Sequence, residues 1–153
     1  MQSKDRINDF VVQIATVNGT GSSSANTLLM KAIFRMGIPV IGKNYFPSNI
    51  QGLPTWYEIR VTGEGHLARS SKVDIMVAMN AQTYAEDLVS VVTNGVLIYD
   101  SSWPRAELED RSDITVLPVP LSKMCNESFT GARARILMKN IAYIGVIAAL
   151  IEI

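Results

Sequence analysis

The chain has 153 residues, 48% of them hydrophobic and 18% charged, and its 14 basic residues balance 14 acidic ones. This composition fits a single folded domain over residues 1–153 and excludes a disordered chain, while zero net charge argues against a broad surface for nucleic acid or a membrane. The single cysteine excludes a disulfide framework, a CxxC redox pair and an iron–sulfur site, and it fits a reducing, cytoplasmic compartment.

The first 41 residues predict a strand, a glycine turn, a helix and a second strand. Phe10–Val17 is β-branched and apolar, Ser22–Arg35 has apolar residues at helical spacing, and Ile38–Ile41 is again apolar. Serines stand where helix N-caps belong, and Gly37 is placed to end the helix. Because such a crossover is right-handed, we expect the two strands to form a parallel pair.

The rest of the chain alternates predicted strands and helices after an irregular segment. Gly42–Trp56 is rich in Gly, Pro and amide residues, and its length indicates a functional or interface loop. The later elements are expected in the order strand, strand, helix, strand, strand and helix, at Tyr57–Thr62, Val73–Met79, Ala81–Val91, Val96–Tyr99, Ile114–Val119 and Ala132–Ile151. The alternation predicts a three-layer, Rossmann-like α/β domain with a mostly parallel sheet and helices on both faces.

The most apolar segment is Ile141–Ile153. It is shorter than a membrane span, so we predict a buried helix and no span. The apolar pattern continues to the last residue, whereas chain ends are usually polar. We therefore expect the domain to be cut from, or packed against, a larger polypeptide.

The segment Asn18–Ser24 lies where a strand–helix unit places a phosphate-binding turn. Glycine permits positive φ and close backbone approach, and the amides and dipole of the helix N-terminus favour an anion. The motif has Ser24 where the dinucleotide fingerprint has its third glycine. The candidate binding residues are Gly19, Thr20, Gly21, Ser22, Ser23 and Ser24. The alternative is a tight turn with capping serines and no ligand.

The acidic residue that holds the ribose in NAD-binding units is absent from its usual place. About 20 residues after the turn, where that acid is expected, the chain has Lys43 followed by Asn44. A cation there disfavours NAD and is compatible with a ligand that has a phosphorylated ribose, such as NADP or coenzyme A.

The remaining candidates form no catalytic set. His66 has no partner at metal or triad spacing and follows a glycine turn, so we expect it to be exposed. Cys125 is interpreted as a small buried hydrophobe. Arg135 and Lys139 lie four residues apart on the last helix, where cations at an amphipathic surface are the simpler interpretation. If the chain serves an enzyme, we expect it to do so as a subunit or domain.

Three segments resemble the gamma domain of 2-oxoacid:ferredoxin (acceptor) oxidoreductases. They are NGTGSSSANTLLMKAIFRMGIPV, GKNYFPSNIQGLPTWYEIRV and VDIMVAMN. The likeness extends through Ile114–Leu121 to the last helix and is greatest to the 2-oxoglutarate type, in which the gamma domain is fused ahead of the alpha domain. Its most specific part is FPSNIQGLPTW. Many relatives carry a G-x-G-G-Q-G turn where this chain has GTGSSS.

The resemblance implies a cytoplasmic complex that oxidatively decarboxylates a 2-oxoacid, forms an acyl-CoA and reduces ferredoxin, with 2-oxoglutarate giving succinyl-CoA. Thiamine diphosphate, with Mg, would lie between the alpha and beta parts, and iron–sulfur clusters would lie in the beta part or a separate subunit. The gamma domain would bind and admit coenzyme A, and would have no catalytic residue and no activity alone. The two alternatives are a purely structural assembly subunit and a free-standing NADP-type nucleotide-binding protein.

The resemblance also implies roles for individual residues. Gly19–Ser24 would hold the coenzyme A phosphates with help from Lys43 and Asn44. A second group would face the alpha/beta active site with its polar side chains, and it comprises Pro47, Ser48, Asn49 and Gln51.

Overall fold

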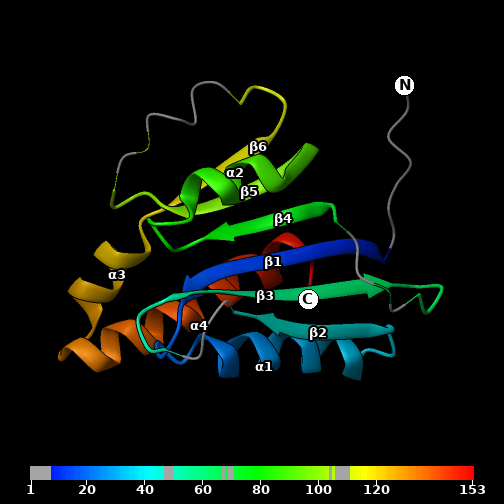
Figure 1. Ribbon diagram of the computed structural model, residues 1–153. Helices are drawn as coiled ribbons and strands as arrows, with labels where there is room; N and C mark the ends of the chain where they lie inside the picture. The colour runs from blue at the N-terminus through cyan, green and yellow to red at the C-terminus, as the bar shows by residue number, and fades with distance from the viewer. Residues whose placement is uncertain (1–7, 47–49, 67, 69–70, 104, 106–110) are drawn as a thin grey trace.

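One six-stranded sheet with helices on both faces forms the domain (Figure 1). The computed structural model describes residues 8–46, 50–66, 68, 71–103, 105 and 111–153. The strands are β1 Asp9–Val17, β2 Val40–Tyr45, β3 Pro54–Thr62, β4 Val73–Ala78, β5 Val91–Asp100 and β6 Thr115–Val119. Their order across the sheet is β2-β3-β1-β4-β5-β6. Strands β1, β4, β5 and β6 are parallel, while β3 is antiparallel to both β1 and β2.

The helices form two layers around this sheet. They are α1 Ser22–Arg35, α2 Tyr84–Ser90, α3 Leu121–Ser128 and α4 Ala132–Leu150. On one face α1 and α4 pack against the alternate strand residues, with Leu29 and Tyr143 almost fully buried. On the other face α2 packs over β4 and β5 through Leu88. The predicted three-layer α/β fold with a mostly parallel sheet is confirmed.

The predicted parallel pairing of the first two strands is wrong. Strand β3 lies between β1 and β2, so that Trp56 is opposite Ala15 on one side and Tyr45 on the other. The crossover through α1 sets the direction of β2, but it leaves room for one strand between the two. The segment Gly42–Trp56, predicted to be irregular, therefore contributes regular residues to β2 and β3 at both of its ends.

The two ends of α1 differ in how well the sequence predicted them. Gly37 has φ 81° and donates its N–H to the Phe34 carbonyl, which confirms the predicted glycine stop. The N-cap is Gly21, which has φ 80° and no side chain that could cap the helix. The serine cap was therefore a wrong prediction. Helix α3 was not predicted at all.

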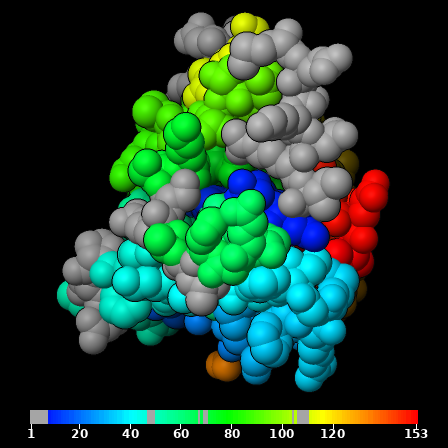
Figure 2. Space-filling model, turned by 90° about the vertical axis from the view of Figure 1, so that its right-hand side faces the viewer, coloured from blue at the N-terminus to red at the C-terminus, as the bar shows by residue number. Residues whose placement is uncertain are grey.

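The carboxyl ends of the four parallel strands meet at one edge of the sheet, on the left in Figure 1. At this edge the chain leaves β1 for α1 on one face and leaves the neighbouring β4 for α2 on the other face. Ligands of α/β proteins bind at such a topological switch point. Figure 2 shows the opposite end of the molecule, with the C-terminal residues in red at its right side.

Candidate functional site

The glycine turn lies at the switch point, between the end of β1 and the start of α1. Gly19 and Gly21 have φ values of 88° and 80°, a region that side chains with a Cβ rarely adopt. Thr20 folds back on the strand, because both its N–H and its hydroxyl donate to the Val17 carbonyl. Two glycines thus allow the chain to reverse within a few residues and begin a helix.

The first turn of α1 presents an uncompensated positive end. Every residue of α1 is described, and none in its first turn is acidic. Ser22 is buried, and its hydroxyl lies 2.9 Å from that of Thr16, whereas Ser23 and Ser24 are exposed. First-turn N–H groups have no carbonyl partner within a helix, and the macrodipole adds positive potential there. This arrangement can hold a phosphate or a carboxylate.

The end of the 46–53 loop packs directly on the glycine turn. Asn18 donates its N–H to the Leu53 carbonyl at 2.8 Å and accepts the Gly52 N–H at 3.0 Å. A Cβ on Gly19 would lie 2.6 Å from Cγ of Gln51, so this side chain covers the turn closely. The structure therefore brings Gln51 together with the candidate anion site. Pro47, Ser48 and Asn49 lie outside the described residues.

The structure does not bring Lys43 to the turn. It lies on β2 opposite Glu58, and its ammonium is 5.2 Å from the centre of the Tyr45 ring on the α2 side of the sheet. Because β2 is two strands from β1, Lys43 is about 10 Å across the sheet and several residues along it from the end of β1. Asn44 points to the α1 side, opposite Tyr57, and its Oδ1 accepts the Thr55 hydroxyl.

A second polar cluster at the same edge was missed by sequence reasoning. Asp100, at the end of β5, accepts N–H groups of Ser102 and Ser122 and the Ser122 hydroxyl, and so caps the start of α3. Burial alone would raise the pKa of Asp100, but these hydrogen bonds outweigh it and lower the pKa. Lys139 of α4 donates to the Ser122 hydroxyl at 3.4 Å. No local pattern around residue 121 signals a cap that comes from 21 residues upstream.

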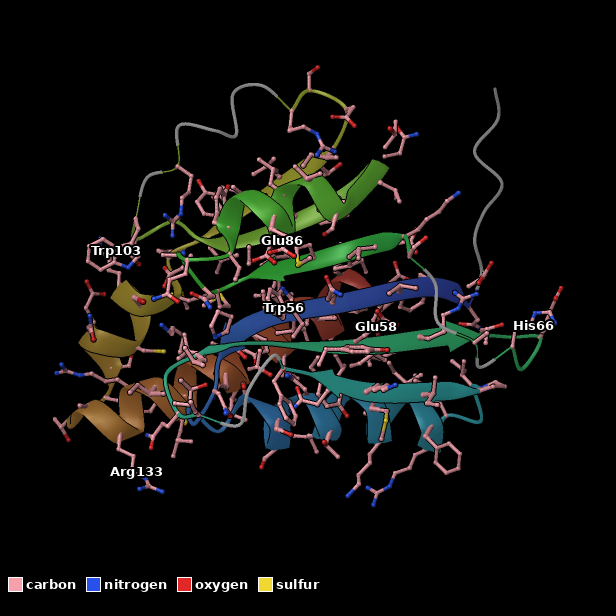
Figure 3. The ribbon with its side chains drawn as sticks, in the orientation of Figure 1. Trp56, Glu58, His66, Glu86, Trp103 and Arg133 are labelled. Atoms are coloured by element: carbon pink, nitrogen blue, oxygen red, sulfur yellow. The ribbon has the colours of Figure 1, made fainter. Side chains whose placement is uncertain are left out.

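A pocket of about 240 Å³ lies on the other face, between α2 and strands β1 to β3. Trp56 and Glu58 lie on β3 on the side that faces α2, which carries Glu86 (Figure 3). The Trp56 indole N–H donates to Asp87 at 2.8 Å, and the Thr83 hydroxyl donates to the second carboxylate oxygen at 2.8 Å. Burial raises the pKa of Asp87 to about 6 in spite of these donors.

Comparison with known proteins assigns the chain to a family. The family model described as pyruvate ferredoxin/flavodoxin oxidoreductase matches residues 11–153. The chain belongs to this family. A 2-oxoacid:ferredoxin oxidoreductase 2 subunit alpha from Aeropyrum pernix is 32% identical over 94 residues, which are 60% of this chain and 14% of the relative. The subunit alpha of 2-oxoacid:ferredoxin oxidoreductase 1 from Sulfurisphaera tokodaii is 25% identical over 89 residues. These residues are 58% of this chain and 14% of the relative. The aligned part is thus a small fraction of either relative.

Solved structures share the fold. The 2-oxoglutarate:ferredoxin oxidoreductase from Magnetococcus marinus, with 2-oxoglutarate, coenzyme A and succinyl-CoA bound, superposes with a TM-score of 0.82 and 22% identity over 95% of this chain and 25% of its own. The gamma subunit of a keto/oxoacid ferredoxin oxidoreductase from Geobacter sulfurreducens superposes with a TM-score of 0.70 and 14% identity. The match covers 92% of this chain and 76% of the gamma subunit. The predicted resemblance to 2-oxoacid:ferredoxin oxidoreductases is confirmed.

The other titratable candidates are placed as the sequence predicted. His66 is exposed at the end of the molecule away from Trp103 and Arg133 (Figure 3), and Cys125 is 3% exposed, where burial raises the pKa of its thiol.

Among the described residues no three His, Cys, Asp or Glu side chains gather as a metal site requires. In the same part of the chain, every helix is too short or too polar to cross a bilayer.

Proposed function

We propose that this domain binds coenzyme A as the gamma part of a 2-oxoacid:ferredoxin oxidoreductase that converts 2-oxoglutarate to succinyl-CoA. The observation that carries the proposal is the first turn of α1, which exposes Ser23 and Ser24, has no acidic residue and lies at the switch point of the sheet. The coenzyme A phosphates would accept N–H groups of Gly21, Ser22 and Ser23. The coenzyme A bound in the solved relative from Magnetococcus marinus supports this choice of ligand.

The chemistry of the reaction would belong to partner parts of the enzyme. A chain with one cysteine cannot supply the four thiolates of an iron–sulfur cluster. Thiamine diphosphate and Mg are therefore proposed to lie between the alpha and beta parts and the clusters in the beta part or a separate subunit, with ferredoxin as electron acceptor. This domain would contribute no catalytic residue, and it would act in a cytoplasmic enzyme through coenzyme A binding and access.

The 46–53 loop, which contains Gln51, is proposed to connect coenzyme A binding at the turn with the alpha/beta active site. Its contact with Gly19 couples the position of the loop to that of the anion site. In this proposal Pro47, Ser48, Asn49 and Gln51 face the alpha/beta active site. Lys43 and Asn44 lie on opposite faces of the edge strand β2, and they are proposed to contact a part of coenzyme A that is distant from the turn and passes around this edge.

Adding a negative charge at the turn tests the proposed site. Ser23→Asp in the assembled enzyme should raise the KM for coenzyme A roughly ten- to a hundredfold, because a carboxylate replaces a donor beside the phosphate. Folding should not suffer, because an acid in the first turn stabilises a helix by about 0.3–1 kcal/mol. The half-reaction that omits coenzyme A should be unchanged. Ser71→Asp, at the rim of the α2-face pocket, is the matched control and should leave the KM unchanged.

Lys43→Glu tests the more distant contact in the same assay. A lost charge-assisted phosphate contact would raise the KM for coenzyme A by roughly ten- to a hundredfold. An unchanged KM would remove Lys43 from the site without affecting the proposal for the turn.

A purely structural role is the second candidate, and one observation favours it. Both glycines of the turn are in close packing contact, with Gln51 at Gly19 and with Leu137 at Gly21. If the turn serves only to join these elements, Ser23→Asp will leave the coenzyme A kinetics intact, and variants of the loop will lose assembly instead.

A further inference from the structure

Helix α4 reaches the glycine turn from a part of the chain about 120 residues away. Asn140 is 4% exposed, and its Nδ2 donates to the Thr20 carbonyl oxygen at 2.9 Å. One turn earlier, Leu137 lies so close that a Cβ on Gly21 would be 2.7 Å from its Cδ2 atom. The two side chains therefore fix the peptide that joins Thr20 to Gly21.

This peptide decides where the first N–H of the proposed anion site points. In a planar, trans peptide the N–H and the carbonyl point in opposite directions. With the Thr20 carbonyl held toward α4, the N–H of Gly21 points away from α4. A flip of this peptide changes ψ of Thr20 and φ of Gly21, and glycine accepts positive and negative φ almost equally, so Gly21 alone would not prevent it. A flipped peptide would present a carbonyl oxygen to the ligand and repel a phosphate.

We propose that Asn140 is a positioning residue for the coenzyme A site, because it holds the Thr20–Gly21 peptide in the orientation that aims an N–H at a phosphate. The inference rests on the proposed function and adds a residue that the sequence motif does not contain. Asn140 need not touch the ligand. Its effect is to keep one orientation of a turn that is otherwise free to adopt two.

The same helix offers a matched control. Tyr143, on the next turn of α4, donates its hydroxyl to Asn26 Oδ1 at 2.9 Å, and both residues are buried. This hydrogen bond also ties α4 to the α1 region over a similar sequence distance, but it does not involve the turn. Tyr143→Phe therefore removes a comparable structural contact and leaves the Thr20–Gly21 peptide held.

The experiment measures coenzyme A kinetics of the assembled enzyme for Asn140→Leu, Asn140→Ala and Tyr143→Phe. Both Asn140 variants should raise the KM for coenzyme A roughly three- to tenfold, as expected for one lost hydrogen bond. The half-reaction without coenzyme A should be unchanged, and Tyr143→Phe should keep the wild-type KM even where it lowers the melting temperature as much. Using two substitutions keeps the test informative if the larger side chain prevents assembly.

Two outcomes would overturn the positioning role. An unchanged KM in both Asn140 variants would do so, and so would an equal rise in Tyr143→Phe, which would indicate general destabilisation. Ser23→Asp separates this failure from failure of the site itself. If Ser23→Asp raises the KM and the Asn140 variants do not, only the positioning role is lost. If none of these variants changes the KM, the turn is not the coenzyme A site.

Discussion

The glycine turn and the α2-face pocket are both candidate ligand sites, and they have opposite chemistry. At the turn, backbone N–H groups and a helix dipole provide positive potential with no acidic side chain in the first turn of α1. The pocket, by contrast, is lined by the carboxyl groups of Glu58, Glu86 and Asp87. A phosphate ligand would be attracted to the first region and repelled from the second.

We infer that the sign of the potential is a better guide to a phosphate site than the volume of a hollow. The pocket offers the aromatic rings of Trp56 and Tyr45 and about 240 Å³ of space, which would make it the first choice on shape alone. Coenzyme A carries several negative charges, which three carboxylates would oppose. The turn at the switch point is therefore the better candidate for its phosphates.

The largest expected effect is on the turn itself. Gly21 and Gly37 stand at opposite ends of α1 with nearly equal φ values of 80° and 81°, but only Gly21 has a close neighbour. Gly37→Ala should lower the free energy of unfolding by about 1–2 kcal/mol, the cost of a left-handed residue. Gly21→Ala should lose up to about 1 kcal/mol more, because its Cβ meets Cδ2 of Leu137 and this partly exposed side chain must turn away. Urea denaturation of both variants measures the difference.

Relief of the contact provides the control for this prediction. Adding Leu137→Ala to Gly21→Ala should recover much of the extra loss, since the crowded Cδ2 atom is gone. Equal losses at Gly21 and Gly37 would contradict the close packing of α4 on the turn.

At the α2-face pocket we expect an electrostatic effect, a dependence of the free energy of unfolding on pH. The pKa of Asp87 is about 6 in the folded chain against 3.8 for the free side chain, so the folded state binds more protons between these values. The contribution of Asp87 to the free energy of unfolding is therefore fully present below about pH 4 and falls as the pH rises toward 6. Above about pH 6 it changes little further. The expected loss from pH 4 to 7 is about 1–3 kcal/mol.

Asp87→Asn isolates this contribution, because an amide can still accept the Trp56 N–H. The pH slopes of wild type and variant should differ between pH 4 and 6, with the variant more stable relative to wild type at pH 7 than at pH 4. The subtraction is needed because Asp100, whose pKa is lowered, acts in the opposite direction. If the stability of wild type and variant changed in parallel with pH, the pKa of Asp87 would not be raised by burial.

The sequence was a good guide to local structure and a poor one to strand neighbours. Helix α1 was predicted to the residue, because apolar spacing and Gly37 are both local signals. The position of Lys43 was counted on the assumption that β2 lies beside β1, and the insertion of β3 moved it to a different part of the sheet. The hydrogen bond from Asn140 to Thr20 joins residues 120 apart, which no pattern in a single sequence reveals.

The smallest expected effect concerns the helices that cover the two regions. Residues 140–150 of α4 contain no charged side chain, and Ile141 is 46% exposed. A helix that is apolar all round is usually covered on both sides, and in the proposed complex the rest of the enzyme would cover it. Ile141→Lys should weaken binding of the chain to the separately produced remainder of the enzyme roughly tenfold in calorimetry. Val89→Lys, at an 80% exposed position on α2, should leave binding unchanged, and equal weakening by both would remove α4 as the preferred contact.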